Sequence, residues 1–114
     1  MPRFVDKNAT YQLDLGECQC PPNPDGSQPH ARDEASIRTQ LSYGEWIKIA
    51  EANSEIEGVM TLLLIRVKSW SLRDANGKPV PVTRQSLEDL DKPTAELLQA
   101  AVVRESEGND PPNT

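Results

Sequence analysis

Apolar residues follow two different periods along the chain, and the change of period divides it into two parts. Residues 11–15 alternate between apolar and polar side chains, which is the pattern of a half-buried strand. Residues 35–41 fit both a strand and a helical spacing, and we favour a strand over 36–41. These segments predict a small amino-terminal β-hairpin with a long, proline-rich connection.

A helical spacing replaces the alternation after Ser42. Serine followed three residues later by glutamate forms a capping box at Ser42 and again at Ser54, so we expect helices over 43–53 and 55–69. The β-branched content of 59–67 also fits a strand, but the spacing of its apolar residues favours the helix. The stripe that we expect this helix to bury is Ile56, Val59, Met60, Leu63, Leu64, Val67 and Trp70.

Turn residues separate this helix from two shorter ones. The Asn76-Gly77 pair predicts a turn with positive φ, and the two prolines of 79–82 predict an extended connector. Helices are expected over 84–91 and 93–105, and the polar residues 106–114 are expected to be a disordered tail.

These elements predict one α+β domain that is predominantly helical. It spans 1–105, with a β element over 11–41, a helical part of about four helices over 43–105 and the tail 106–114 outside it. The chain has 114 residues, which is the size of a single domain core.

Charge and residue content exclude several functions. The chain carries 18 acidic and 12 basic side chains, a net charge of −6, which disfavours nucleic acid and anionic membranes as partners. It has one histidine, no glycine-rich phosphate loop and no nucleophile elbow, so we expect no enzymatic activity. Without an apolar run long enough to span a bilayer, we expect a soluble protein in the cytoplasm.

Three residue types suited to zinc lie around the proline-rich connection. Cys18 and Cys20 precede it and His30 follows it, and two thiolates with one imidazole are three of the four ligands of a tetrahedral zinc site. The fourth ligand could be Asp33, Glu34 or water. A structural zinc would hold a connection that a small core cannot. The alternative is two small buried cysteines beside a surface histidine.

One segment of the chain resembles a known family. Residues 67–83 comprise Val-Lys-Ser-Trp-Ser-Leu-Arg-Asp-Ala-Asn-Gly-Lys-Pro-Val-Pro-Val-Thr, between an apolar helix and a leucine-rich region. This order of tryptophan, turn and double proline resembles the tail assembly chaperones of long-tailed bacteriophages, over roughly 56–103. The resemblance implies a chaperone in the host cytoplasm that coats the tape measure protein and helps recruit tail tube subunits. The Cys-x-Cys connection is not part of the family's pattern.

A binding mode follows from the predicted helices. We expect an apolar groove between the helices of 43–69 and 84–105 to receive amphipathic tape measure helices, and self-association is compatible with such a surface. The candidate contacts, which fall beside the best stripes, are Trp46, Ile49, Leu62, Ile65 and Leu98. Two other functions stay open: a structural virion component such as a tail or head-joining subunit, and a small zinc-binding adaptor.

Overall fold

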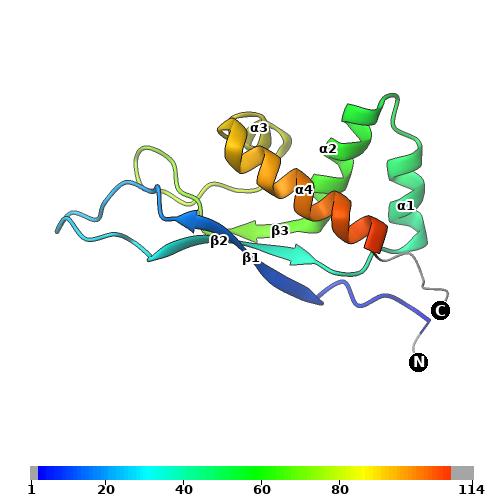
Figure 1. The fold of residues 1–114 in the computed structure, drawn as a ribbon, viewed down its shortest axis with the longest axis horizontal. Helices are drawn as coiled ribbons and strands as arrows, with labels where there is room; N and C mark the ends of the chain where they lie inside the picture. The colour runs from blue at the N-terminus through cyan, green and yellow to red at the C-terminus, as the bar shows by residue number, and fades with distance from the viewer. Residues whose placement is uncertain (1–2, 109–114) are drawn as a thin grey trace.

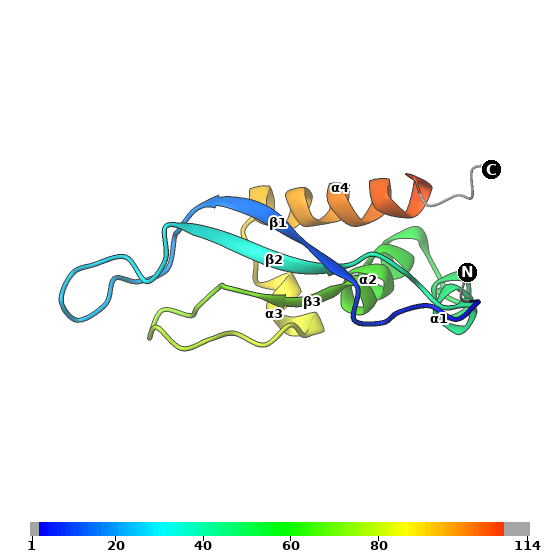
Figure 2. The same cartoon turned by 90° about the horizontal axis from the view of Figure 1, so that it is seen from below.

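The structure is a two-layer arrangement of a small sheet and four helices. The computed structural model describes residues 3–108 and the side chains of residues 3–103. Its elements are β1 (Thr10–Glu17), β2 (Arg32–Arg38), α1 (Tyr43–Ala50), α2 (Glu55–Arg66), β3 (Val67–Trp70), α3 (Arg84–Glu88) and α4 (Lys92–Gly108). The strands form one antiparallel sheet in the order β1-β2-β3, and the helices lie on one side of it (Figure 1). Seen from below, α4 lies on the β1 side and α3 on the β3 side (Figure 2).

Cross-strand rows of apolar residues make the inner face of the sheet. Leu13 of β1 pairs with Ala35 of β2, which in turn pairs with Trp70 of β3. The strand predicted over 11–15 is confirmed within the longer β1, because one face of this segment packs on the core while Gln12 and Asp14 are exposed. The strand expected over 36–41 lies earlier, as β2. β1 is longer than predicted and β2 begins earlier than predicted, because the two strands pair with each other beyond their apolar positions.

The expectation of a predominantly helical fold is wrong. The helix predicted over 55–69 ends at Arg66, and Val67–Trp70 continues as β3 beside the central strand β2. The free edge of β2 offers backbone partners that a fourth helical turn would not use, and a β-branched valine at the junction suits an extended backbone. The chain is therefore an α+β protein in which a three-stranded sheet and the helices both contribute residues to the core.

The buried face of α2 also differs from the predicted stripe. Ile56, the first residue of that stripe, is 74% exposed, and Leu64 is 39% exposed. The residues of α2 that are buried are Leu62, Leu63 and Arg66. The other five residues of that stripe do lie in or against the core: Leu63 and Val67 are buried, and Val59, Met60 and Trp70 pack against it. Because α2 packs against α1 and α4 as well as the sheet, Leu62 and Arg66 are buried beside the predicted stripe.

Helix ends agree with the capping signals more closely than helix lengths do. The capping box at Ser42 is confirmed by reciprocal bonds with Glu45. At Ser54 one of the two bonds of the predicted box forms: Ser54 accepts from the Glu57 N–H, whereas the Glu57 carboxylate accepts from Arg84. The predicted helices 43–53 and 84–91 are shorter, as α1 and α3, and 93–105 is longer, as α4. Of the tail expected over 106–114, 106–108 belong to α4 and 109–114 lie outside the described residues. Among the described residues, no helix has the length and apolar character needed to cross a bilayer.

Two buried arginines join the sheet to the helices. The guanidinium of Arg38, at the end of β2, donates to both carboxylate oxygens of Glu45 at 2.6 and 2.9 Å. Arg66 is fully buried, and its Nε donates to the Arg38 carbonyl while Nη1 donates to the Val102 carbonyl of α4. Buried charges stabilise a fold only when they are paired and hydrogen-bonded, so these contacts fix where α1, α2 and α4 sit.

The Glu45 carboxylate predicts a measurable acid sensitivity. The hydrogen bonds from Arg38 lower its pKa from the usual range to about 2, against the opposing effect of burial. Its contribution to stability is therefore present above its unfolded pKa of about 4.5 and is lost as pH falls towards the folded value. We expect the free energy of unfolding of the wild type, relative to Glu45→Gln, to fall by about 2–3 kcal/mol between about pH 5 and about pH 2.

Urea denaturation at several pH values measures this difference. Glu55→Gln is the matched control, since Glu55 is exposed and forms no ion pair within residues 3–103. Parallel pH profiles for wild type and Glu45→Gln would contradict the prediction.

Candidate metal centre

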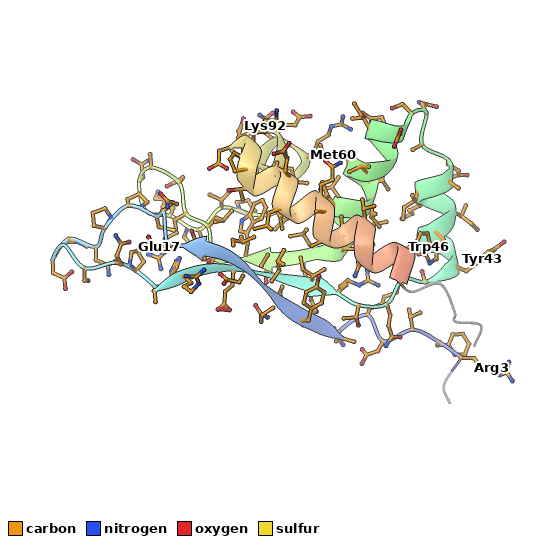
Figure 3. All side chains as sticks on the ribbon, viewed as in Figure 1. Arg3, Glu17, Tyr43, Trp46, Met60 and Lys92 are labelled. Carbon is orange, nitrogen blue, oxygen red and sulfur yellow. The ribbon has the colours of Figure 1, made fainter. Side chains whose placement is uncertain are left out.

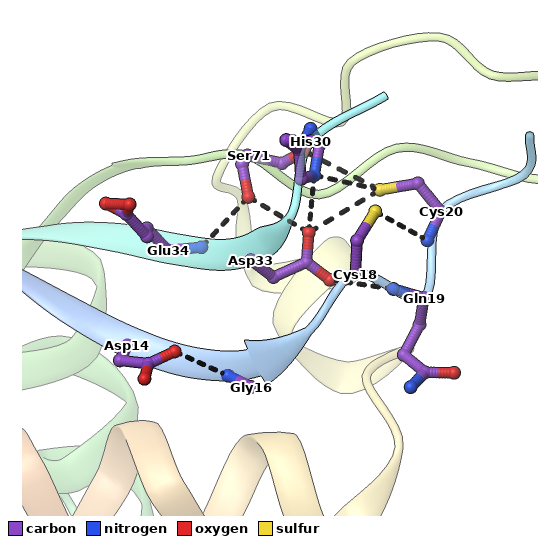
Figure 4. Close-up of polar contacts among 9 residues, drawn as sticks. All are labelled: Asp14, Gly16, Cys18, Gln19, Cys20, His30, Asp33, Glu34 and Ser71. Carbon is purple, nitrogen blue, oxygen red and sulfur yellow. Dashed lines mark hydrogen bonds and ion pairs between the residues drawn. The ribbon is translucent and has the colours of Figure 1, made fainter. Parts of the chain in front are cut away.

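The proline-rich connection leaves the sheet and returns to it at the same point. β1 bends where its register shifts between Asp14 and Gly16, and Gly16 adopts a φ of 103° that a side chain would disfavour. The Cys18 N–H then donates to the Ala31 carbonyl at 3.4 Å, which continues the pairing past the strand ends. The two stems of the connection therefore bring Cys18 and Cys20 beside His30 and Asp33 (Figure 4).

These four side chains form one compact cluster. A ligand atom from each of Cys18, Cys20, His30 and Asp33 lies within 4.8 Å of the others. The Cys20 Sγ is 3.5 Å from His30 Nε2 and 3.6 Å from Asp33 Oδ1. Metal–ligand lengths in a tetrahedral zinc site place sulfur about 3.5 Å from a nitrogen or oxygen ligand, so both distances already fit. His30 Nε2 and Asp33 Oδ1 are closer, at 2.6 Å, as expected for a direct hydrogen bond.

The Asp33 carboxylate is the best supported member of the cluster. It is 3% exposed, and it accepts hydrogen bonds from the Gln19 N–H and the Ser71 hydroxyl, each at 3.1 Å. Burial alone would raise the pKa of Asp33, but the bonds from Gln19, His30 and Ser71 outweigh it and hold the pKa below its usual value. The carboxylate is therefore charged and fixed in direction, as a metal ligand needs to be.

Both cysteine sulfurs contact the backbone. The Cys20 thiol donates to the Ser71 carbonyl at 3.8 Å, and the Cys18 Sγ accepts from the Cys20 backbone N–H at 3.4 Å. Burial, together with the neighbouring Cys18 thiol and the Asp33 charge, raises the pKa of Cys20 to about 11. In the absence of a cation this thiol is protonated at neutral pH, and a bound metal would displace that proton.

The structure brings together all four residues that the sequence indicated for a metal site. It selects Asp33 over Glu34 as the fourth member, because Glu34 is exposed and alternation along β2 places it on the opposite face. Sequence reasoning missed Ser71, whose hydroxyl also accepts from the Glu34 N–H at 3.0 Å. No local signal marks Ser71, since its place beside β2 depends on β3, which the sequence did not predict.

The five predicted partner contacts do not form one surface. Leu62 is 6% exposed and Leu98 is 0% exposed, both in the core, while Ile49 and Ile65 are half-buried against it. Trp46 alone is exposed, on α1 near Tyr43 (Figure 3).

Comparison with protein-family models, curated proteins and solved structures finds no match for this chain. The function of the chain therefore has to be inferred from its sequence and its structure.

Removing the Asp33 carboxylate tests the hydrogen-bond network without any metal. In Asp33→Ala, the half-buried Ser71 hydroxyl and the Gln19 N–H lose their acceptor, so we expect the free energy of unfolding to fall by about 2–3 kcal/mol. Urea denaturation in the presence of a chelator measures it. The control is Asp25→Ala, at an exposed carboxylate of the same connection, and an equal loss in both variants would contradict the network.

Proposed function

We propose that this chain is a non-catalytic binding protein that serves as a tail assembly chaperone, with its docking surface in a cleft between the helices. The cleft is the observation that carries the proposal. It has a volume of about 230 Å³, and α2 forms one wall while α3, the residues after it and α4 form the other. Its apolar lining residues are Ile56, Val59, Met60, Leu63, Leu87, Leu90, Ala95 and Leu98.

The cleft has the properties of a groove for an amphipathic helix. Ile56 at its rim is 74% exposed, while Met60 lies one helical turn further along α2, on the side of α3 (Figure 3). An apolar groove lined in this way can receive the apolar face of a partner helix. The resemblance to tail assembly chaperones implies that the ligand of this cleft is an amphipathic helix of the tape measure protein.

The segment that carries the resemblance forms one closed unit in this chain. The Trp70 indole N–H donates to the Val80 carbonyl at 2.6 Å, and Val80 lies between the two prolines. The Val80 N–H returns a bond to the Leu72 carbonyl at 3.2 Å, and the turn between them closes at Gly77, where φ is 79°. Tryptophan, turn and double proline therefore depend on one another, which supports treating the pattern as a unit rather than as separate common features.

A binding assay with the tape measure protein tests the chaperone proposal. We expect Ile56→Glu to weaken capture of a tape measure fragment at least roughly tenfold, because it places a charge on the apolar rim at a position that contributes little to the core. Ile47→Glu is the matched control, since Ile47 is 41% exposed on α1, away from the cleft. Equal capture by wild type and Ile56→Glu, or none by wild type, would contradict the proposal.

Mass spectrometry of purified particles separates the chaperone from the structural alternative. A chaperone is absent from the finished particle, whereas a tail or head-joining subunit is present at stoichiometric amounts. Stoichiometric presence would therefore replace the proposed role with a structural one.

We further propose that Cys18, Cys20, His30 and Asp33 hold a structural Zn²⁺. Two thiolates, an imidazole and a carboxylate suit zinc better than magnesium or calcium, and four protein ligands leave no open position for chemistry. The ion would tie both stems of the proline-rich connection together. Through the bond between Ser71 and Asp33, it would also tie them to the segment that follows β3.

Metal analysis of the purified full chain tests this site. We expect one equivalent of zinc in the wild type and in the control Ser27→Ala, and none in Cys20→Ser. Zinc at a free concentration about a thousandfold above its dissociation constant should raise the free energy of unfolding by about 4 kcal/mol. A wild type without zinc, or a Cys20→Ser variant that retains it, would contradict the site.

A further inference from the structure

A second cavity lies between the metal-site cluster and the α3–α4 junction. It has a volume of about 380 Å³, at the lower end of the roughly 300–1,000 Å³ that ligand pockets occupy. It is distinct from the cleft described above, with which it shares Leu90 alone. Its walls come from segments far apart in the sequence, from the end of β1 to the start of α4.

The inner walls of this cavity are apolar and only partly covered. They are formed by Leu15, Trp70, Leu72, Val80 and Leu90, each of which is half-buried. The Trp70 N–H is already bonded to Val80, so the indole needs no polar partner from a ligand. The indole offers a ligand an apolar surface, and the π face of its ring attracts cations.

The rim of the cavity carries a net negative charge. Asp74, Asp89 and Asp91 line it together with a single cation, Arg73. Asp33 also lines it but belongs to the metal-site cluster. In the part of the chain whose side chains are described, none of the three rim aspartates forms an ion pair. The hydrogen bonds that they accept come from neutral donors: backbone amides, the Gln85 amide and the Thr94 side chain.

From this combination we propose that the cavity binds a basic polypeptide segment, one in which a bulky apolar side chain is flanked by lysine or arginine. The apolar side chain enters between Trp70 and Leu90, and the flanking cations meet the rim aspartates. Charge complementarity favours a basic ligand. The net negative rim would repel an anionic ligand, and an uncharged ligand would leave the rim aspartates without a cationic partner. The inference does not depend on the chaperone role.

Titration of two short peptides into the isotope-labelled full chain tests the proposal by NMR. The probe is acetyl-Lys-Leu-Phe-Lys-amide, and its charge-reversed counterpart is acetyl-Glu-Leu-Phe-Glu-amide. We expect the basic peptide to shift the amides of Leu72, Val80 and Leu90, and the acidic peptide to shift none of them. The shifts should weaken when salt is raised from about 0.1 to about 0.5 M.

Neutralising the rim provides the matched variants. Asp89→Asn with Asp91→Asn keeps the shape of both side chains and keeps a residue that can cap α4 at position 91, and it should weaken binding of the basic peptide roughly three- to tenfold. Glu51→Gln with Glu96→Gln removes the same charge from exposed positions elsewhere and should leave binding unchanged. Equal shifts with both peptides, shifts centred on another surface, or unchanged affinity in the aspartate variant would each overturn the proposal.

Discussion

The pair of buried arginines where the sheet meets the helices is the constraint on which the rest of the structure depends. Arg38 reaches Glu45 of α1 and Arg66 reaches the carbonyls of β2 and α4, so the central strand is joined to three helices through charged hydrogen bonds. A guanidinium in a dry interior tolerates little displacement, because a lost partner leaves a charge without compensation. These hydrogen bonds link the helices to the sheet at defined points, in addition to the apolar packing between them.

The strand β2, which carries Arg38, also positions the metal-site cluster at its other end. The strand carries Arg38 at its carboxyl end and Asp33 near its amino end, so the same element that positions the helices also positions the metal-site cluster. β3 supplies the third part, since the residue after it, Ser71, bonds to both Asp33 and the Glu34 N–H. The cluster is therefore built on sheet pairing, although three of its four members come from a connection rich in proline.

Sequence patterns predicted the local features and missed those that depend on long-range pairing. The capping box at Ser42 and the metal-site cluster followed from short-range spacing and residue chemistry, and both are present. The strand Val67–Trp70 was not predicted, because its residues continue a helical apolar period and only the edge of β2 makes an extended backbone favourable. Arg66 was missed for a related reason. A charged residue at the end of an amphipathic helix is usually exposed, and nothing local indicates the carbonyls that it meets in the core.

The shift of register between Asp14 and Gly16 has a consequence for how the molecule meets its own copies. β1 is an outer strand, and an outer strand exposes backbone groups that can add a further strand from another chain. At Gly16 the backbone turns away from the regular ladder, and the charged pair of Asp14 with Arg32 lies just before it on the solvent face. A second chain aligned along β1 would lose hydrogen-bond register within a few residues. The register shift that places the cysteines thus also disfavours the addition of a strand from a second chain along the edge strand β1.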